Sequence, residues 1–392
     1  MKIKISEPVV IARGPSYEEC GWGPYQFPDL FPLPDGRIMC AFADSSDTID
    51  AYGAERACFV SADKGATWER ARERDFDPIM GIELENGERV HFIELDSIKM
   101  TEDMQFPKSR GTTKGGKINY YLTSEMPDGI CEKNWQIYRV SKEYPEGRME
   151  PAILNWPNHV TKAGMGIVVP PQPWGRLRKA PDGSLWMPDY AVGLNPDNGG
   201  FSPYSSNYTL RSTDGGRTWD LMHYLDFRPC TYDHPRAFQH EGMSENDIGF
   251  APDGSYIRVI RTNAVNPDVH GPLYLVRSTD KGVTWSKPMK LDDVGAWPRL
   301  CTLGCGVTLT SYGRPGFFVR ATSDPSCLTW EDPIELVHVN DGEDPWAATC
   351  SYSDIMPIDD HTAGLIYTDF KIKDENGVER KTVLFRTITV ED

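Results

Sequence analysis

One eight-residue pattern occurs three times in this chain, far apart and with different neighbours each time. It reads SADKGATW at 61–68, STDGGRTW at 212–219 and STDKGVTW at 278–285. Asp accepts hydrogen bonds from nearby backbone amides, Gly adopts the positive φ that follows, and Ser or Thr satisfies further amides of the same turn. Trp anchors such a turn on the sheet beneath it. Because a catalytic motif is normally needed once, the repetition indicates a structural turn that is used several times.

Each octet follows a segment that is typical of a strand: ERACFV, NYTLR and PLYLVR. A weaker fourth copy, SDPSCLTW, follows PGFFVRAT and keeps the spacing from Ser323 to Trp330, but it lacks the Gly. We therefore expect the octets to be turns at strand ends, without chemistry of their own. This expectation applies to the following polar residues of the octets: Ser61, Asp63, Ser212 and Asp214.

A second repeat consists of a turn followed by a strand-like run. It appears at 33–42, 84–92, 180–190 and 251–260, with looser versions at 303–312 and 358–367. Asp-Gly or Asn-Gly between β-rich runs is the strongest short-range signal for a hairpin. Six hairpins, several followed by an octet, indicate one small sheet used six times. Since radial repetition of small sheets gives a β-propeller, we predict an all-β, six-bladed β-propeller.

We expect one domain over residues 1–392, because large all-β folds often run to this length as a single unit. The stretch from about 93 to 175 carries no octet and is rich in loop residues. We expect it to hold the second blade and a loop-rich insertion. The last strand-like run, KTVLFRTITV, is expected to close the ring by pairing with the N-terminal segment.

Charge and composition exclude several function classes. A formal net charge of −17 argues against binding to nucleic acid or to anionic membranes, since both need clustered Lys and Arg. The N-terminus lacks a signal-peptide pattern and no apolar run is long enough to span a bilayer. The nine cysteines form no CxxC pair, which favours reduced thiols. We expect a cytoplasmic protein, or a secreted one if a leader has been removed, with no cofactor and no required metal.

The octets and their flanking segments resemble the Asp-boxes and blades of the sialidase superfamily, over nearly the whole chain. Where sialidases have Tyr-Arg-Ile-Pro before the first hairpin, this chain has YQFP at 25–28. Sialidases also carry a Glu shortly before a hairpin whose second strand ends in Arg, and SENDIGFAPDGSYIRVIRT supplies Glu245 and Arg261. A further family Arg matches Arg314. The segment SYSDIMPIDD resembles the family's Tyr-Ser-Asp-Leu motif and contains Tyr352.

The resemblance implies catalytic roles for three of these positions. Tyr352 would attack the anomeric carbon while Glu245 takes its proton, because a phenol with a pKa of about 10 needs a base partner near neutral pH. A neutral nucleophile also suits an anionic sugar, which would repel a carboxylate. The acid/base would be Asp50, with Asp47 as the second choice, although a histidine is a further option.

The chain departs from the sialidase pattern at Gln26, where the first of three substrate-binding arginines should stand. Glutamine donates hydrogen bonds but carries no charge, so a bidentate ion pair with a carboxylate is lost. Arg261 and Arg314 remain as predicted substrate-binding residues, together with Gln26 itself. Three explanations of Gln26 are open. The substrate has its acid group at another position, or it is uncharged, or another arginine such as Arg176 or Arg178 binds it. An ordinary exo-sialidase is not expected.

A polar segment, DHPRAFQHEGMSEND, lies just ahead of Glu245 and is placed to line the pocket. It contains two histidines, an arginine and a glutamate: His234, Arg236, His240 and Glu241. Histidine is a natural general acid or base. We assign Arg236 and His240 to substrate binding, with loop histidines bonded to neighbouring backbone as the alternative. A zinc site is disfavoured because no third ligand is evident.

Several aromatic side chains could stack on sugar rings, and the two beside Gln26 are the best candidates. We therefore predict that Trp22 and Tyr25 bind substrate. Trp174 and Trp297 could also do so, although indoles in a propeller more often serve in packing.

Taken together, these features predict a glycoside hydrolase that removes a terminal sugar, acidic or neutral, from a glycan or glycoconjugate. Two alternatives from other classes stay open. One is a carbohydrate-binding propeller without turnover, since the loss of one arginine is what early decay of a site would produce. The other is a polysaccharide lyase that uses His and Tyr for proton abstraction. The sequence leaves the oligomeric state open.

Overall fold

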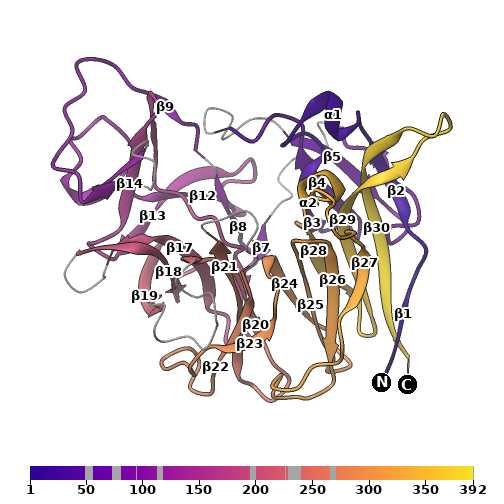
Figure 1. Cartoon of the computed structure of the whole chain (residues 1–392). Helices are drawn as coiled ribbons and strands as arrows, with labels where there is room; N and C mark the ends of the chain where they lie inside the picture. The colour runs from indigo at the N-terminus through magenta and orange to yellow at the C-terminus, as the bar shows by residue number, and fades with distance from the viewer. Residues whose placement is uncertain are drawn as a thin grey trace.

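The structure is a computed structural model that describes residues 1–48, 56–72, 81–93, 95–112, 118–194, 200–225, 227, 240–264 and 271–391. Strands dominate these ranges (Figure 1). The helical segments among them are short: α1 (Tyr17–Cys20), a 3-10 turn at Thr123–Glu125 and α2 (Pro345–Ala348).

Two sheets of the molecule are separate four-stranded antiparallel units. The first contains β3 (Gln26–Pro32), β4 (Ile38–Ala43), β5 (Arg56–Ser61) and β6 (Glu69–Arg70). The second contains β24 (Ala296–Thr302), β25 (Thr308–Gly313), β26 (Phe317–Thr322) and β27 (Ile334–Val337). In both, the sequence order of the strands is also their order in the sheet. This meander is what consecutive hairpins produce.

The twelve-stranded sheet consists of three similar antiparallel units. The first unit contains β7 (Ile82–Glu83), β8 (Arg89–Ile93), β12 (Trp135–Val140) and β13 (Arg148–Asn155). The second contains β16 (Arg178–Lys179), β17 (Leu185–Leu194), β18 (Phe201–Ser212) and β19 (Thr218–Leu225). The third contains β20 (His240–Phe250), β21 (Tyr256–Ala264), β22 (Leu273–Ser278) and β23 (Met289–Asp292). Short parallel pairings join the units, between β13 and β19 and between β18 and β20.

The last sheet joins the two ends of the chain. It contains β28 (Asp354–Asp359), β29 (Thr362–Lys373), β30 (Glu379–Glu391), β1 (Lys2–Ile5) and β2 (Val9–Arg13). β30 pairs with both N-terminal strands, and Lys2 lies opposite Glu391. Figure 1 accordingly shows the N- and C-termini side by side. The predicted pairing of the last strand with the N-terminal segment is confirmed.

Buried aspartates connect the innermost strands of neighbouring sheets. Asp354 of β28 accepts a hydrogen bond from the backbone N–H of Leu30 in β3, at 2.8 Å. Asp247 of β20 does the same for Leu300 of β24, at 2.9 Å. Both carboxylates are fully buried. The strand content and the antiparallel four-stranded units confirm the all-β propeller class, while the number of blades stays a prediction.

The stretch between 93 and 175, which we expected to hold the second blade and a loop-rich insertion, contains strands of two sheets. Part of it is β12 and β13, and the rest forms a five-stranded sheet of its own from β9 (Ile98–Lys99), β10 (Gly111–Thr112), β11 (Ile118–Leu122), β14 (Val160–Gly164) and β15 (Ile167–Val169). We call this the accessory sheet. It has its own apolar cluster, which includes Tyr121, Met126 and Val168, and it lies at the upper left of Figure 1.

The octets form the turns that their residues predict. In the first copy Gly65 N donates to Ser61 Oγ at 2.8 Å, and Thr67 N and Oγ1 donate to Asp63 at 2.8 and 2.6 Å. The Trp68 indole N–H donates to the Gly65 carbonyl at 3.1 Å. The copies at 212–219 and 278–285 repeat these bonds. The polar side chains of the octets are therefore occupied within their own turns.

The fourth copy is built differently from the prediction. Thr322, not Ser323, supplies the hydroxyl, which accepts from Asp324 N at 2.9 Å. The turn is one residue longer, and Cys327 takes the place of the missing glycine with a φ of 54°. Trp330 still donates to the Cys327 carbonyl, at 2.8 Å.

Candidate functional site

Tyr352 and Glu245 meet although they are 107 residues apart in the chain. Tyr352 precedes β28, and its hydroxyl donates to Glu245 Oε1 at 2.5 Å. Glu245 lies on β20 at a register shift between Met243 and Asn246 in the pairing with β21. A bulge of this kind re-aims a side chain out of the regular alternation of a strand. The irregularity therefore helps to turn the Glu245 carboxylate toward Tyr352.

Three donors surround the Glu245 carboxylate. Besides Tyr352, Arg261 Nη1 donates at 2.6 Å and the Trp297 backbone N–H donates at 3.0 Å. Burial alone would raise the pKa of Glu245, but the charge and hydrogen bond of Arg261 hold it below its usual value. Glu245 is therefore an ionised carboxylate that already accepts a hydrogen bond from a phenol.

Tyr352 is held as a neutral phenol. Burial and the adjacent Glu245 charge raise its pKa well above the ordinary value. Arg261 Nη1 lies 3.4 Å from its oxygen. Its ring contacts Trp297, with centroids 4.7 Å apart, and meets Phe27 edge-on at 4.9 Å. Positive charge is thus available beside the oxygen if the phenol loses its proton.

Arg314 lies beside Tyr352 among aromatic rings. Its guanidinium carbon is 4.0 Å from the Trp346 ring centroid and 5.3 Å from those of Trp22 and Tyr352. Nη2 donates to the Cys350 carbonyl at 2.7 Å. Within the described ranges Arg314 pairs with no carboxylate, and its buried Nε has no hydrogen-bond partner. Burial, and then Arg261, lower its pKa. This arginine has the capacity to bind an anionic or polar ligand group.

Backbone strain gathers around these side chains. Phe27, Trp297, Arg314 and Ser351 are not glycines, yet they have φ values of 55°, 45°, 63° and 60°. Such conformations are unfavourable for L-residues and persist where surrounding structure enforces them, commonly at functional sites. Three of these residues contact Tyr352, and Ser351 precedes it. The site is therefore held in a geometry that the chain would not adopt by local preference.

The aromatic residues predicted near Gln26 have different positions. Trp22 contacts Arg314, and its indole N–H donates to Asp47 at 2.9 Å, so it belongs to the site region. The structure does not bring Tyr25 to Tyr352. Its ring packs on Phe42, with centroids 5.5 Å apart, in the apolar cluster of the first sheet. Tyr25 therefore packs against the first sheet in this structure, and its role in sugar stacking stays a prediction.

Gln26 is fully buried, and both polar atoms of its amide lack a hydrogen-bond partner among the described residues. An unsatisfied buried amide costs about 1–3 kcal/mol. The neighbouring Phe27 contacts Tyr352, so Gln26 lies close to the site along the chain. Its role in substrate binding stays a prediction.

Arg176 and Arg178 do not replace the missing arginine. Arg176 pairs with Asp354 and donates to the Leu30 carbonyl at 2.9 Å. Arg178 forms a bidentate pair with Asp247, with Nε at 3.0 Å from Oδ1. These arginines complete the links between the inner strands, and this corrects the option that they reach the substrate.

The remaining predicted residues, Asp50, Arg236 and His234, lie outside the described residues, as does the side chain of His240. Their roles stay predictions. Sequence reasoning missed Tyr190 and Trp346. Tyr190 lines the same small pocket as Glu245, and burial and then the charges of Glu245 and Tyr352 raise the pKa of Tyr190 well above its ordinary value. The sequence did offer a signal for Tyr190. It follows the Asp-Gly turn at 182–183 on the next strand, just as Arg261 follows the Asp-Gly turn at 253–254.

A small, closely packed pocket adjoins Glu245; its outline takes in about 200 Å³, but its walls leave no room for a water molecule. Its lining combines aromatic, amide and charged groups: Trp174, Gly175, Tyr190, Glu245, Asn246, Trp297, Pro298 and Arg299. Within the described part of the chain, no three His, Cys, Asp or Glu side chains gather as a metal site. Among the same residues, every helix is too short or too polar to cross a membrane.

Comparison with known proteins identifies similar structures but no similar sequence. No family model matches the chain, and no curated protein matches it. A protein of unknown function from Dyadobacter fermentans is 17% identical with a TM-score of 0.62, and the match covers 99% of each chain. A mutant of the NanB sialidase from Streptococcus pneumoniae is 14% identical with a TM-score of 0.51, over 98% of this chain and 71% of the sialidase.

The α-L-arabinofuranosidase Arb93A from Fusarium graminearum is 13% identical with a TM-score of 0.50, over 97% of this chain and 98% of that enzyme. At sequence identities this low, the structural match demonstrates a shared fold and leaves the activity open. Propeller-fold glycoside hydrolases of two specificities are thus among the structural neighbours. The chain has a sialidase-like propeller fold.

Proposed function

We propose that this chain is a glycoside hydrolase that removes a terminal sugar from a glycan, with Tyr352 as nucleophile and Glu245 as its base. The observation that carries the proposal is the 2.5 Å hydrogen bond from the phenol to a carboxylate that Arg261 holds ionised. A nucleophile within hydrogen-bond reach of a base, which is itself oriented by a third group, is the arrangement expected of covalent catalysis.

The reaction follows from the protonation states of the pair. As the Tyr352 oxygen attacks the anomeric carbon, its proton passes to Glu245 and the glycosidic bond breaks. The leaving oxygen takes a proton from a general acid, for which Asp50 is the first candidate and Asp47 the second. Water then attacks the glycosyl–tyrosine intermediate and gives a proton to the same acidic residue, while Glu245 returns its proton to the departing Tyr352 oxygen and restores the phenol. Two displacements retain the anomeric configuration.

Arg261 and Arg314 stabilise the transition state in this scheme. Negative charge develops on the phenol oxygen as its proton leaves, and Arg261 lies 3.4 Å from that oxygen. Fixed positive groups in a buried site favour such charge without having to reorganise. Arg314, which has no carboxylate partner among the described residues, is left to contact the substrate.

The substrate is inferred from what surrounds the pair. Two guanidinium groups lie next to Tyr352, and the uncharged Gln26 stands where a third would support an ordinary sialidase. We infer a non-sialic terminal sugar as the substrate. The structural neighbours are compatible with this inference, because an α-L-arabinofuranosidase has the same fold as the sialidases.

The proposal is tested with a panel of aryl glycosides that carry sialic, uronic and neutral sugars. Wild type, Tyr352→Phe and the matched control Tyr144→Phe, at an exposed tyrosine, are compared. We expect hydrolysis by wild type and the control, and loss of at least about 10³-fold in Tyr352→Phe. Activity that survives in Tyr352→Phe would reject this nucleophile.

The same panel, extended to polysaccharides, separates the alternatives. A binding propeller would bind glycans without forming any product. A lyase would release unsaturated products that absorb in the ultraviolet, which a hydrolase does not. Strong hydrolysis of the sialoside would show that Gln26 does not exclude ordinary sialidase substrates.

A further inference from the structure

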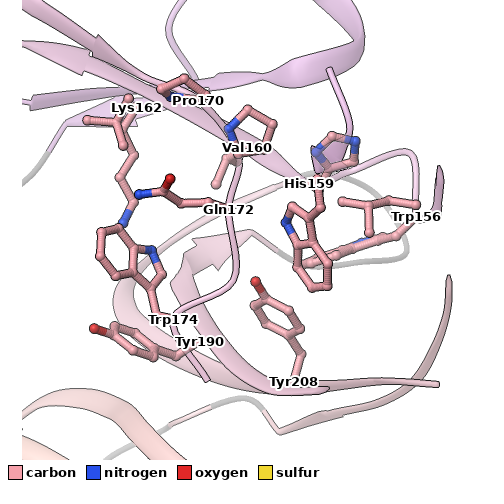
Figure 2. Close-up of a pocket in the computed structure, with 13 residues that line it drawn as sticks. Trp156, His159, Val160, Lys162, Pro170, Gln172, Trp174, Tyr190 and Tyr208 are labelled. Atoms are coloured by element: carbon pink, nitrogen blue, oxygen red, sulfur yellow. The ribbon is translucent and has the colours of Figure 1, made fainter. Parts of the chain in front are cut away.

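A second, larger pocket lies between strands β14 and β15 of the accessory sheet and strands β12, β13, β17 and β18 of the twelve-stranded sheet, and no step of the proposed reaction uses it (Figure 2). Its outline takes in about 490 Å³, a figure that includes open solvent, while the free volume between its walls is about 30 Å³. A sugar therefore enters this pocket only if lining side chains move apart. Trp174 and Tyr190 stand on one side, Trp156 and His159 on the other, with Tyr208 below them in this view. Aromatic walls with a few polar groups are typical of sites for small organic ligands.

Three polar side-chain atoms of this pocket are buried without a hydrogen-bond partner among the described residues. They are the Trp156 indole N–H, the Gln172 amide N–H and His159 Nδ1. Trp156 and Gln172 are only 3% and 6% exposed. The Gln172 carbonyl oxygen is engaged, because Leu95 N donates to it at 2.7 Å, so the unsatisfied part is the amide NH₂. Buried polar groups are rarely left unpaired. These atoms therefore indicate a ligand with oxygen acceptors.

Lys162 brings positive charge to the same pocket. Its ammonium lies 5.3 Å from the Trp174 ring centroid, and within the described ranges no carboxylate lies within ion-pair distance of it. Burial lowers its pKa, with a smaller opposing effect from Asp189. An ammonium in this environment gains most from a nearby anion.

The pocket shares two lining residues with the small pocket beside Glu245. Trp174 and Tyr190 line both this pocket and the cavity beside Glu245. Tyr190 lies near enough to Glu245 and Tyr352 for their charges to raise its pKa. These two shared aromatic residues place the larger pocket next to the one beside Glu245.

We propose that this pocket binds the second sugar of the substrate, on the leaving-group side of the scissile bond, through an anionic substituent held by Lys162. The inference rests on the proposed function, in which a terminal unit is cleaved and the next unit leaves. Indole and phenol rings provide platforms for the sugar faces. The Trp156 and Gln172 donors match ring and hydroxyl oxygens, and a carboxylate or sulfate pairs with the ammonium.

The test is binding of single sugars to Tyr352→Phe, measured by saturation-transfer NMR with concentration series. The probes are D-glucuronate, glucose 6-sulfate and glucose, which separate a carboxylate, a sulfate and a neutral sugar. Each is measured with and without Lys162→Met, and with Lys179→Met as the control for loss of a lysine from the neighbouring strand β16. Thermal unfolding confirms that the variants fold.

We expect at least one acidic probe to bind at least about tenfold more tightly than glucose, and Lys162→Met, but not Lys179→Met, to abolish that preference. Equal binding of acidic and neutral probes, or an unchanged preference in Lys162→Met, would overturn the inference. Binding needs no turnover, so the two proposals can fail separately. If the protein binds acidic sugars but wild type hydrolyses no glycoside, the proposal for this pocket holds and the proposed glycosidase activity is rejected. If wild type hydrolyses a glycoside but Lys162→Met has no effect on sugar binding, the glycosidase proposal holds and the proposal for this pocket is rejected.

Discussion

Replacing Arg261 with methionine removes the group that keeps Glu245 ionised. The guanidinium lies 2.6 Å from the carboxylate, and both side chains are largely buried. A nearby opposite charge lowers a carboxyl pKa by about 1–3 units, so its removal should raise the pKa of Glu245 by that amount. Breaking one partner of a buried pair costs on the order of 3–5 kcal/mol of folding free energy, because the other charge is left unpaired.

The sign of the pH effect follows from linkage. The folded-state pKa of Glu245 is depressed in wild type, so its contribution to stability is present above the unfolded pKa and is lost as the pH falls through the folded value. In Arg261→Met the folded-state pKa of Glu245 is raised toward or above the unfolded value, so this loss of stability on acidification is reduced or reversed. Once Glu245 is protonated it needs no cation, so the difference in stability between wild type and variant should be largest near pH 7 and should shrink toward pH 4.

Two assays follow this difference. Thermal unfolding of wild type, Arg261→Met and the charge-preserving Arg261→Lys is measured from pH 4 to 8. With a substrate in hand, the acidic limb of kcat/KM should move upward by about 1–3 pH units in Arg261→Met and less in Arg261→Lys. A stability difference that does not vary with pH, together with an unmoved acidic limb, would refute the claim that Arg261 sets the charge of Glu245.

Three further outcomes are expected. Asp247→Asn should lower the free energy of unfolding in urea by on the order of 3 kcal/mol, because the buried Arg178 loses its counter-charge, and a loss under about 1 kcal/mol would contradict this. Burial raises the pKa of Asp189 to about 7, so the contribution of Asp189 to stability falls as the pH rises from about 4 to 7. Asp189→Asn should flatten the dependence of stability on pH over this range, and an unchanged slope would contradict the raised pKa. Gln26→Met should leave the melting temperature unchanged or raise it, because an unsatisfied buried amide is removed, while activity falls; a clear loss of stability would mean that the amide is satisfied.

The octets and hairpins were predictable because their information is local. Asp63 and Thr67 bond each other within one turn, so the sequence needs no distant partner to specify it. The fourth copy shows the limit of such reasoning. Thr322 and Cys327 form its turn with an extra residue, which a fixed spacing does not reveal. The accessory sheet was missed for a related reason, since strands of two residues such as Ile98–Lys99 have no detectable alternation.

The candidate site was predicted only where a motif pointed to it. Nothing in local propensity brings Tyr352 to Glu245 across 107 residues, and their proximity was expected from the family resemblance. The ion pairs of Arg176 with Asp354 and of Arg178 with Asp247 were not predictable, because these aspartates lie on strands far away in the chain. Trp346 was missed for the same reason, since it reaches Arg314 only in the folded chain.

The most direct measurement traps the covalent intermediate. Wild type is incubated with the fluorinated glycosyl fluoride of whichever sugar the aryl-glycoside panel identifies, and the protein is digested and mapped by mass spectrometry. The account predicts one glycosyl label per chain, on the peptide that contains Tyr352, and no label in Tyr352→Phe. A label on Glu245 or on another residue, or release of product with inverted configuration and no label, would contradict it.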